Sequence, residues 1–178
     1  MKEIKRNLTI IGVIIMMMIL FLIKYESPYT PYEEIPQHIS EEMHKPIKIK
    51  KHFSDKYYEY FLYTIGESTL VGMSSYERHF KGGYTRVARG GAAGLFKTYH
   101  TTGGENGIYE QYIVYGQNLN KIISKIKLDF GDVIKMEDIS NEDYYLKVYC
   151  FFDKNRRDPE VFFYDENNND ITKKILDY

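Results

Sequence analysis

The segment YERHF, residues 76–80, holds the side chains best suited to acid–base chemistry. In an extended strand Glu77 and His79 point to the same face, so the carboxylate could orient the imidazole as a general base. Ser74 or Ser75 would then supply the nucleophile. No G-x-S-x-G turn supports this arrangement, and a cross-strand ion pair explains the Glu and His spacing equally well. We therefore expect no catalytic site. If the protein does have one, Glu77 and His79 are the candidate residues.

The segment DENNNDIT, residues 165–172, places oxygen-bearing side chains at alternate positions, as a calcium loop does. Asp165, Asn167 and Asn169 would be the first metal ligands. The glycine position of an EF-hand loop holds Asp170, however, and the twelfth position holds Leu176 instead of a bidentate Glu. The sequence therefore predicts a polar turn, with weak calcium binding as the alternative.

Histidine and cysteine usage gives no sign of a metal or cofactor site. The five histidines lack a zinc spacing such as H-E-x-x-H. The single cysteine, Cys150, cannot form an internal disulfide. In YYLKVYCFF it shares strand parity with Tyr144, Leu146 and Val148, which predicts a small buried apolar residue rather than a nucleophile.

The glycine-rich segment 86–107 does not have the spacing of a phosphate-binding loop. It matches neither G-x-x-x-x-G-K-[ST] nor a G-x-G-x-x-G between a strand and a helix. The glycines at 82–83, 90–91, 94, 103–104 and 107 instead separate runs of strand-forming residues. We predict that they form hairpin turns, where glycine supplies a positive φ.

The aromatic segments TYH and IYEQYIVYG could form a recognition surface for a glycan or a peptide. Its predicted members are Tyr99, His100, Tyr109 and Tyr112. Tyrosine combines an apolar ring with a hydroxyl and is common at binding surfaces. It is also an ordinary strand residue, so a purely structural role is the alternative.

Strands must position these candidates, because period-two alternation begins at Pro46 and helical periodicity is nearly absent. The predicted strand segments are 47–53, 57–65, 68–80, 83–88, 94–100, 108–116, 121–130, 131–139, 144–152 and 159–172, the last with a polar turn before a short final strand. Segment 121–130 also fits a short helix. The predicted fold is mainly β, an antiparallel β-sandwich or open-barrel-like domain of about ten short strands after one N-terminal transmembrane helix.

The N-terminal residues predict a membrane anchor. Residues 8–23 carry no charge, basic residues precede them, and Lys24 follows. The predicted parts are a cytoplasmic tail at 1–7, a transmembrane anchor at 8–24, a juxtamembrane spacer at 25–45 and an extracytoplasmic β domain at 46–178. A cleaved signal peptide is the alternative, but the proline-rich segment that follows lacks small residues at a cleavage site. A short acidic helix with Pro36 in its first turn is expected within the spacer.

Several short segments resemble one group of proteins. A G-x-Y segment at residues 82–84 precedes a strand ending in Y-G-x-N, residues 115–118. An I-x-x-I strand follows at 123–126, then a Y-D-x-x-x-N-x-I ending at 164–171. Over residues 57–173 this order resembles small exported or membrane-anchored β-rich proteins of low-GC Gram-positive bacteria with no assigned activity. The resemblance implies an anchored β domain and identifies no functional residue.

These features favour a binding role. The net charge of -1 argues against a nucleic-acid partner. We expect a non-enzymatic, membrane-anchored extracytoplasmic module that binds, senses or assists at the bacterial cell envelope, with the membrane and a protein or cell-wall ligand as partners. The alternatives are an envelope hydrolase that uses Glu77 and His79, or a structural subunit of a membrane complex.

Overall fold

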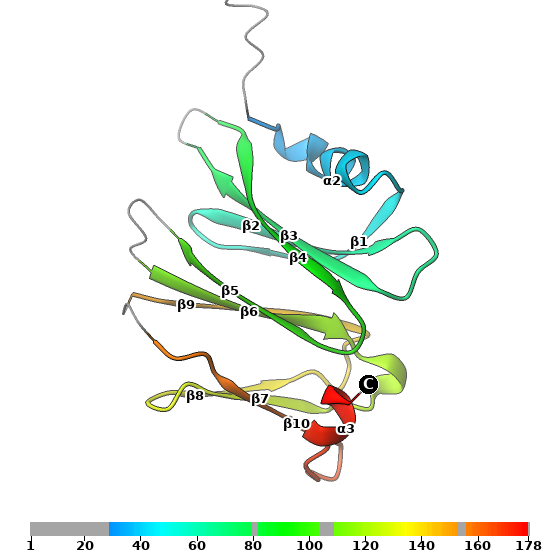
Figure 1. Ribbon diagram of the computed structural model, residues 1–178, viewed down its shortest axis with the longest axis vertical. Coiled ribbons are helices and arrows are strands. Elements are labelled where there is room, and N and C mark those ends of the chain that lie inside the picture. The colour runs from blue at the N-terminus through cyan, green and yellow to red at the C-terminus, as the bar shows by residue number, and fades with distance from the viewer. Residues whose placement is uncertain (1–28, 80–81, 104–108, 153–155, 178) are drawn as a thin grey trace, which may run out of the picture.

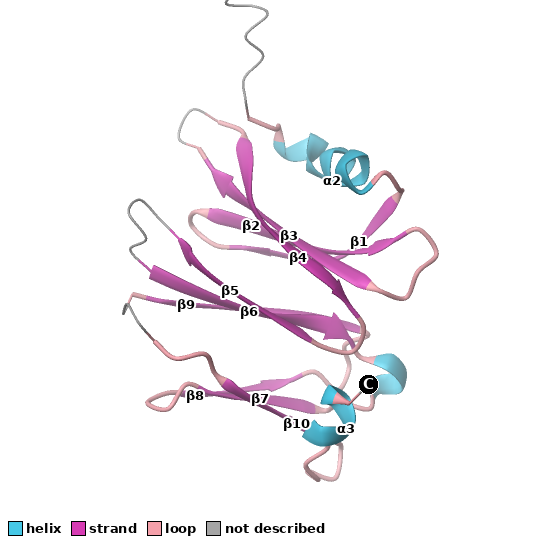
Figure 2. Ribbon diagram, viewed as in Figure 1, coloured by secondary structure: helices cyan, strands magenta, loops and turns pink. Residues whose placement is uncertain are grey.

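The protein is built from three antiparallel β-sheets stacked as layers (Figure 1). The computed structural model describes residues 29–79, 82–103, 109–152 and 156–177. It contains ten strands, and its few short helices lie outside the sheets (Figure 2). The predicted mainly β character is therefore confirmed. The sheets do not close into a barrel, and the layers number three rather than the two of a simple sandwich.

The first sheet is a meander of four consecutive strands. Its order is β1(Ile47–Ser54), β2(Tyr58–Ile65), β3(Val71–Arg78) and β4(Tyr84–Ala93), each antiparallel to the next. The short helices η1(Tyr32–Glu34) and α2(Ile35–Met43) precede it. Helix α2 lies over the outer face of this sheet (Figure 1).

The other two sheets have three strands each. The middle sheet has the order β5(Lys97–Gly103), β6(Tyr109–Gln117) and β9(Tyr144–Phe151). The third sheet has the order β10(Glu160–Tyr164), β7(Lys125–Asp129) and β8(Ile134–Asp138). Turn η2(Leu119–Lys121) connects β6 to β7, and helix α3(Thr172–Leu176) follows β10.

The middle sheet is buried on both faces, which explains its aromatic and β-branched sequence. Along β6, Tyr112 and Val114 pack towards the third sheet, while Ile113 and Tyr115 pack towards the first. The chain therefore has an apolar core on each side of one sheet, and a third small core lies under α2.

Helix α2 belongs to this packed unit, although its residues fall within the predicted spacer 25–45. Ile35 and Ile39 are buried against Phe61, Tyr63 and Tyr76. The expected acidic helix with a proline in its first turn is present. None of the helices among the described residues has the length and apolarity needed to cross a bilayer. The predicted anchor at 8–24 lies outside the described residues.

Two predictions about local structure are wrong. Gly90 and Gly91 lie inside β4, not in a turn. The predicted final strand is reduced to one bridge, between Tyr164 and Asp170, and the chain then turns into α3. The ambiguous segment 121–130 forms strand β7 over its second half. Gly82 and Gly83 do have positive φ angles of 85° and 81°, as the turn prediction requires.

The glycine pair in β4 makes room for a tyrosine of the neighbouring sheet. The Tyr115 hydroxyl donates a hydrogen bond of 2.8 Å to the Gly91 carbonyl. A Cβ atom on Gly90 would overlap that same hydroxyl. The tyrosine thus buries its ring and still satisfies its polar atom, which a buried hydroxyl needs.

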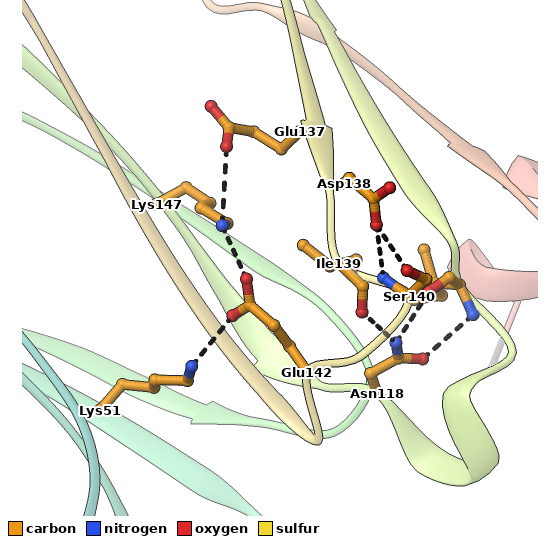
Figure 3. Close-up of polar contacts among 9 residues, drawn as sticks. Lys51, Asn118, Glu137, Asp138, Ile139, Ser140, Glu142 and Lys147 are labelled. Carbon is orange, nitrogen blue, oxygen red and sulfur yellow. Dashed lines mark hydrogen bonds and ion pairs between the residues drawn. The ribbon is translucent and has the colours of Figure 1, made fainter.

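The loops at one end of the layers are held by a buried amide and a chain of ion pairs (Figure 3). The Asn118 amide nitrogen donates to the carbonyls of Ile123 and Ile139 at 2.7 and 3.1 Å. Nearby, Glu142 lies 3.2 Å from Lys51 of the first sheet and 2.9 Å from Lys147 of the middle sheet. Lys147 also lies 3.5 Å from Glu137, so charged contacts reach all three sheets.

Replacing Gly90 by Ala is expected to lower the free energy of unfolding by about 1–3 kcal/mol, because the new methyl group overlaps the Tyr115 hydroxyl. Gly90→Ala should lower the free energy of unfolding less in a Tyr115→Phe background, where that hydroxyl is absent. Urea unfolding of the two single variants and the double variant measures this difference. Gly94→Ala is the control, since a Cβ there meets nothing within 4 Å. Equal costs at positions 90 and 94 would contradict the tight fit.

Candidate functional site

A cleft opens at the edge of the middle sheet, where Thr98 and His100 of strand β5 are exposed. Its volume is about 160 Å³. The lining residues come from β5, β6 and the segment that leads into β10: Thr98, Tyr99, His100, Tyr112, Ile113, Val114, Asp158 and Pro159. Residues far apart in sequence therefore build one small site.

The floor of the cleft is a stacked pair of rings. His100 and Tyr112 are directly opposite in the β5–β6 ladder. Their ring centroids lie 4.2 Å apart with an interplanar angle of 14°. The His100 Nδ1 atom is 3.0 Å from a carboxylate oxygen of Asp158, and its Nε2 atom is 3.9 Å from Glu110. The imidazole is thus fixed by a ring on one side and carboxylates at both nitrogens.

The Tyr112 hydroxyl is held by two hydrogen bonds, which fix the ring on which His100 stacks. It lies 2.8 Å from the Glu110 carboxylate and 2.6 Å from the carbonyl oxygen of Arg156. The backbone N–H of Arg156 donates to the same carboxylate at 3.1 Å. Burial, together with the hydrogen bond to Glu110, raises the pKa of Tyr112 well above its ordinary value. The phenol therefore stays protonated at neutral pH.

Three of the four residues predicted for a recognition surface line the cleft, but only His100 and Tyr112 have their rings stacked together there. Tyr99 alternates to the opposite face, where its ring packs against the core between the first and middle sheets. Tyr109 begins β6, and its side chain lies outside the described part of the chain. Glu110 shares the parity of Tyr112 and could have been included from the sequence. Nothing in the sequence indicated that Asp158 belongs to the site, because only the fold brings it near β5.

The residues predicted as a catalytic cluster serve separate contacts. The His79 Nε2 atom lies 2.9 Å from the Thr85 hydroxyl, and its ring stacks on Tyr29 at 4.1 Å. Glu77 lies in β3, opposite Thr85 in the ladder with β4. No hydrogen bond or ion pair joins Glu77 to His79 within the described ranges.

The two candidate serines point to opposite faces of β3. The Ser74 hydroxyl lies 3.3 Å from the Tyr63 hydroxyl, on the α2 side of the sheet. Ser75 faces the core, and within the described residues its buried hydroxyl has no hydrogen-bond partner. Neither serine contacts His79, so the nucleophile and base pairing that the sequence allowed is not formed.

The best-formed carboxylate cluster in the first sheet centres on Glu59, which is 2% exposed. Its carboxylate lies 2.7 Å from His52 and pairs with the Arg78 guanidinium. Burial opposes ionisation, but the hydrogen bonds from Arg78 and His52 outweigh it, so the pKa of Glu59 lies below its ordinary value. This cluster joins β1, β2 and β3. Its charged residues therefore have a structural role, and no catalytic role is needed to account for them.

The segment predicted as a polar turn, with weak calcium binding as the alternative, is a hydrogen-bonded turn. One Asp165 oxygen accepts the backbone N–H groups of Asn167 and Asn169, each at 2.9 Å, and the other accepts the Asn169 amide. The Asn169 amide leads the contacts that lower the pKa of Asp165. Over the described ranges, no group of three or more His, Cys, Asp or Glu side chains is placed to hold a metal ion.

The prediction that Cys150 is buried is wrong. The residue is exposed near the end of β9, past the core that Leu146 and Val148 join on the same face of the strand. Its sulfur lies 3.8 Å from the Asp55 carboxylate. Partial desolvation of the sulfur and the charge of Asp55 raise the pKa of the Cys150 thiol to about 11. A thiol with a raised pKa holds little thiolate at neutral pH, so it is a weak nucleophile.

Comparison with known proteins adds no relative to this picture. No family model matches the chain, and neither does any curated protein or solved structure. Functional inference therefore rests on the residues and geometry described above.

Arg78→Gln is expected to raise the pKa of Glu59 and to lower the free energy of unfolding at neutral pH by about 1–2 kcal/mol, since a partly exposed partner is screened by solvent. Glu59 has a depressed pKa, so its stabilising effect is present above the unfolded pKa and is lost as the pH falls through the folded pKa. Because Arg78→Gln raises the pKa of Glu59 in the folded state, the stability that Glu59 contributes should be lost at a higher pH.

Circular dichroism during acid titration should therefore show the Arg78→Gln variant unfolding at a higher pH than the original chain. Arg89→Gln, which replaces an exposed arginine of the adjacent strand, serves as the control. Identical acid transitions in all three proteins would mean that Arg78 does not stabilise the ionised carboxylate.

Proposed function

We propose that the protein is a membrane-anchored, extracytoplasmic binding module of the bacterial cell envelope, and that it is not an enzyme. The cleft of His100, Tyr112 and Asp158 carries this proposal, because it is a polar, partly open site on a rigid scaffold. Binding sites are commonly built this way, from loops and strand edges held by a packed core.

The chemistry of the cleft favours binding over catalysis. Neither Ser nor Cys is among its described lining residues. The Glu110 carboxylate lies beneath the ring pair, next to the Tyr112 hydroxyl and the Arg156 backbone. His100 has aromatic and acidic neighbours, and within the described ranges no hydrogen bond joins it to the hydroxyl of the lining residue Thr98. This arrangement positions donors and acceptors for a ligand without a group to be activated.

The membrane assignment is supported by the sequence. Residues 8–23 carry no charge, and basic residues precede them. By the positive-inside rule the N-terminus then lies in the cytoplasm and the β domain outside. The resemblance to exported or anchored β-rich proteins agrees with this orientation.

Orientation is tested by protease treatment of intact protoplasts that express the full chain with a different epitope at each end. The C-terminal epitope should be removed and the N-terminal epitope should be spared, because only the β domain is expected outside. Lysed protoplasts, in which both epitopes are cleaved, are the control. A C-terminal epitope that survives on intact protoplasts would refute the proposed location.

Binding is tested by sedimenting the full chain, in detergent micelles, with purified cell envelopes. His100→Ala should lower the apparent affinity about tenfold, since it removes one side of the cleft, a loss of about 1.4 kcal/mol. The double variant Glu77→Gln, His79→Ala should bind like the original chain. A hydrolase that uses Glu77 and His79 predicts the reverse. A structural subunit predicts co-purifying membrane proteins and no effect of either change.

A further inference from the structure

Strand β5 presents an open edge next to the cleft. It bonds to β6 on one side, and within the described part of the chain no strand or isolated bridge pairs with its other side. An unpaired strand edge offers a row of N–H and C=O groups to another chain. Proteins use such edges to bind extended peptides as an added strand.

The edge strands of the first sheet are modified in ways that hinder strand addition. Strand β1 has a register shift between Ile49 and Lys51 and several lysines. The start of β4 is covered by Thr30, whose N–H and C=O bond with Tyr84 at 2.8 Å each. Bulges, lysines and covering segments all discourage pairing with other chains.

The remaining edges are short or charged. Strands β8 and β10 have five residues each. Strand β9 carries Lys147, which is engaged by two glutamates. Strand β5 is seven residues long and reads KTYHTTG; its one lysine is the first residue, and the rest is mostly strand-forming, without proline or an acidic residue. Of the described edges, β5 is therefore the one best suited to accept another strand.

The cleft would receive side chains from a strand added to β5. Successive residues of such a strand point to opposite faces, so every second side chain lies on the His100 face. Asp158 stands there with its side chain 75% exposed. Neither Lys nor Arg is among the described lining residues. The nearby Arg156 guanidinium instead pairs with Asp132 and covers Phe151. The charge of the cleft thus favours a cationic side chain.

A glycan fits this site less well. Sugar recognition by tyrosine needs an accessible ring face, but Tyr112 is only 3% exposed and His100 covers it. The Tyr99 ring packs on the opposite face of the sheet. The features that remain accessible are the strand edge, the imidazole and the Asp158 carboxylate, and these match a peptide backbone with a basic side chain.

We propose that β5 binds an extended peptide as a fourth strand of the middle sheet, with a Lys or Arg side chain in the cleft beside Asp158. This inference rests on the proposed binding function and specifies its ligand class. Main-chain hydrogen bonds would supply most of the affinity, and the basic side chain would fix the register.

The test uses the full chain in detergent micelles and a fluorescent seven-residue peptide, Thr-Val-Thr-Lys-Thr-Val-Thr, capped at both ends. Fluorescence polarisation should show binding that weakens about tenfold when Glu replaces the central Lys, and about tenfold in the Asp158→Asn protein. Asp143→Asn, which changes an equally exposed carboxylate at 75%, should bind like the original chain.

Backbone pairing is tested with two further peptides, each N-methylated at alternate residues so that one edge or the other cannot donate. One of the two should lose binding and the other should keep it, because only one edge can face β5. Equal binding of the Lys and Glu peptides, or of both methylated peptides, would overturn the inference.

The two proposals fail in different ways. If none of the peptides binds while sedimentation with envelopes still depends on His100, the binding function stands and the peptide ligand is wrong. Competition of envelope binding by soluble glycan would also reject the peptide. The chain could also self-associate to the same extent with and without Asp158→Asn. A second copy would then occupy the β5 edge, and the peptide inference would again be wrong.

Discussion

The structure depends on one sheet being buried on both faces. The middle sheet must present apolar side chains in two directions, and most of its aromatic residues are tyrosines, each with a hydroxyl to satisfy. Tyr115 donates to the Gly91 carbonyl in the first sheet, and Tyr145 donates to the Leu95 carbonyl in the connection between them. These contacts need close approach, and glycine provides it: a Cβ on Gly116 would lie 2.6 Å from the Tyr145 hydroxyl. In both contacts a tyrosine side chain thus occupies the space that a side chain at the glycine position would need.

The same constraint determines where a ligand can bind. Two covered faces leave the middle sheet only its edges, and Thr98 and His100 of the edge strand β5 remain exposed. His100 and Tyr112 therefore belong partly to the core and partly to the surface. The aromatic stack stabilises the layer beneath it, while the Asp158 carboxylate faces solvent. A site of this kind is held rigidly by residues that the fold already requires, which limits the ordering cost of binding.

The sequence predicts the strands well because alternation and turn residues are local signals. It could not show that Gly90 and Gly91 lie within β4, since the residue that requires them, Tyr115, is distant in the chain. Cys150 has the parity of a buried residue, but parity does not reveal that the strand extends past the core there. For the site, aromatic composition indicated His100 and Tyr112, whereas Asp158 enters through a connection between two sheets. In each case the missing information is tertiary.

Charged residues join the layers where apolar packing ends. Stacked sheets lie about 10 Å apart, a distance that one lysine and one carboxylate can span, as Lys147 and Glu137 do. Glu142, in the turn between β8 and β9, pairs with Lys51 of the first sheet and Lys147 of the middle sheet, and Lys147 also pairs with Glu137 of the third (Figure 3). These side chains are partly exposed, so each pair contributes at most about 1 kcal/mol. Their greater effect is on specificity, because a shifted layer would leave several charges without partners. Buried Asn118 acts in the same way for the loops beside them, since its amide fits only one arrangement of the Ile123 and Ile139 carbonyls.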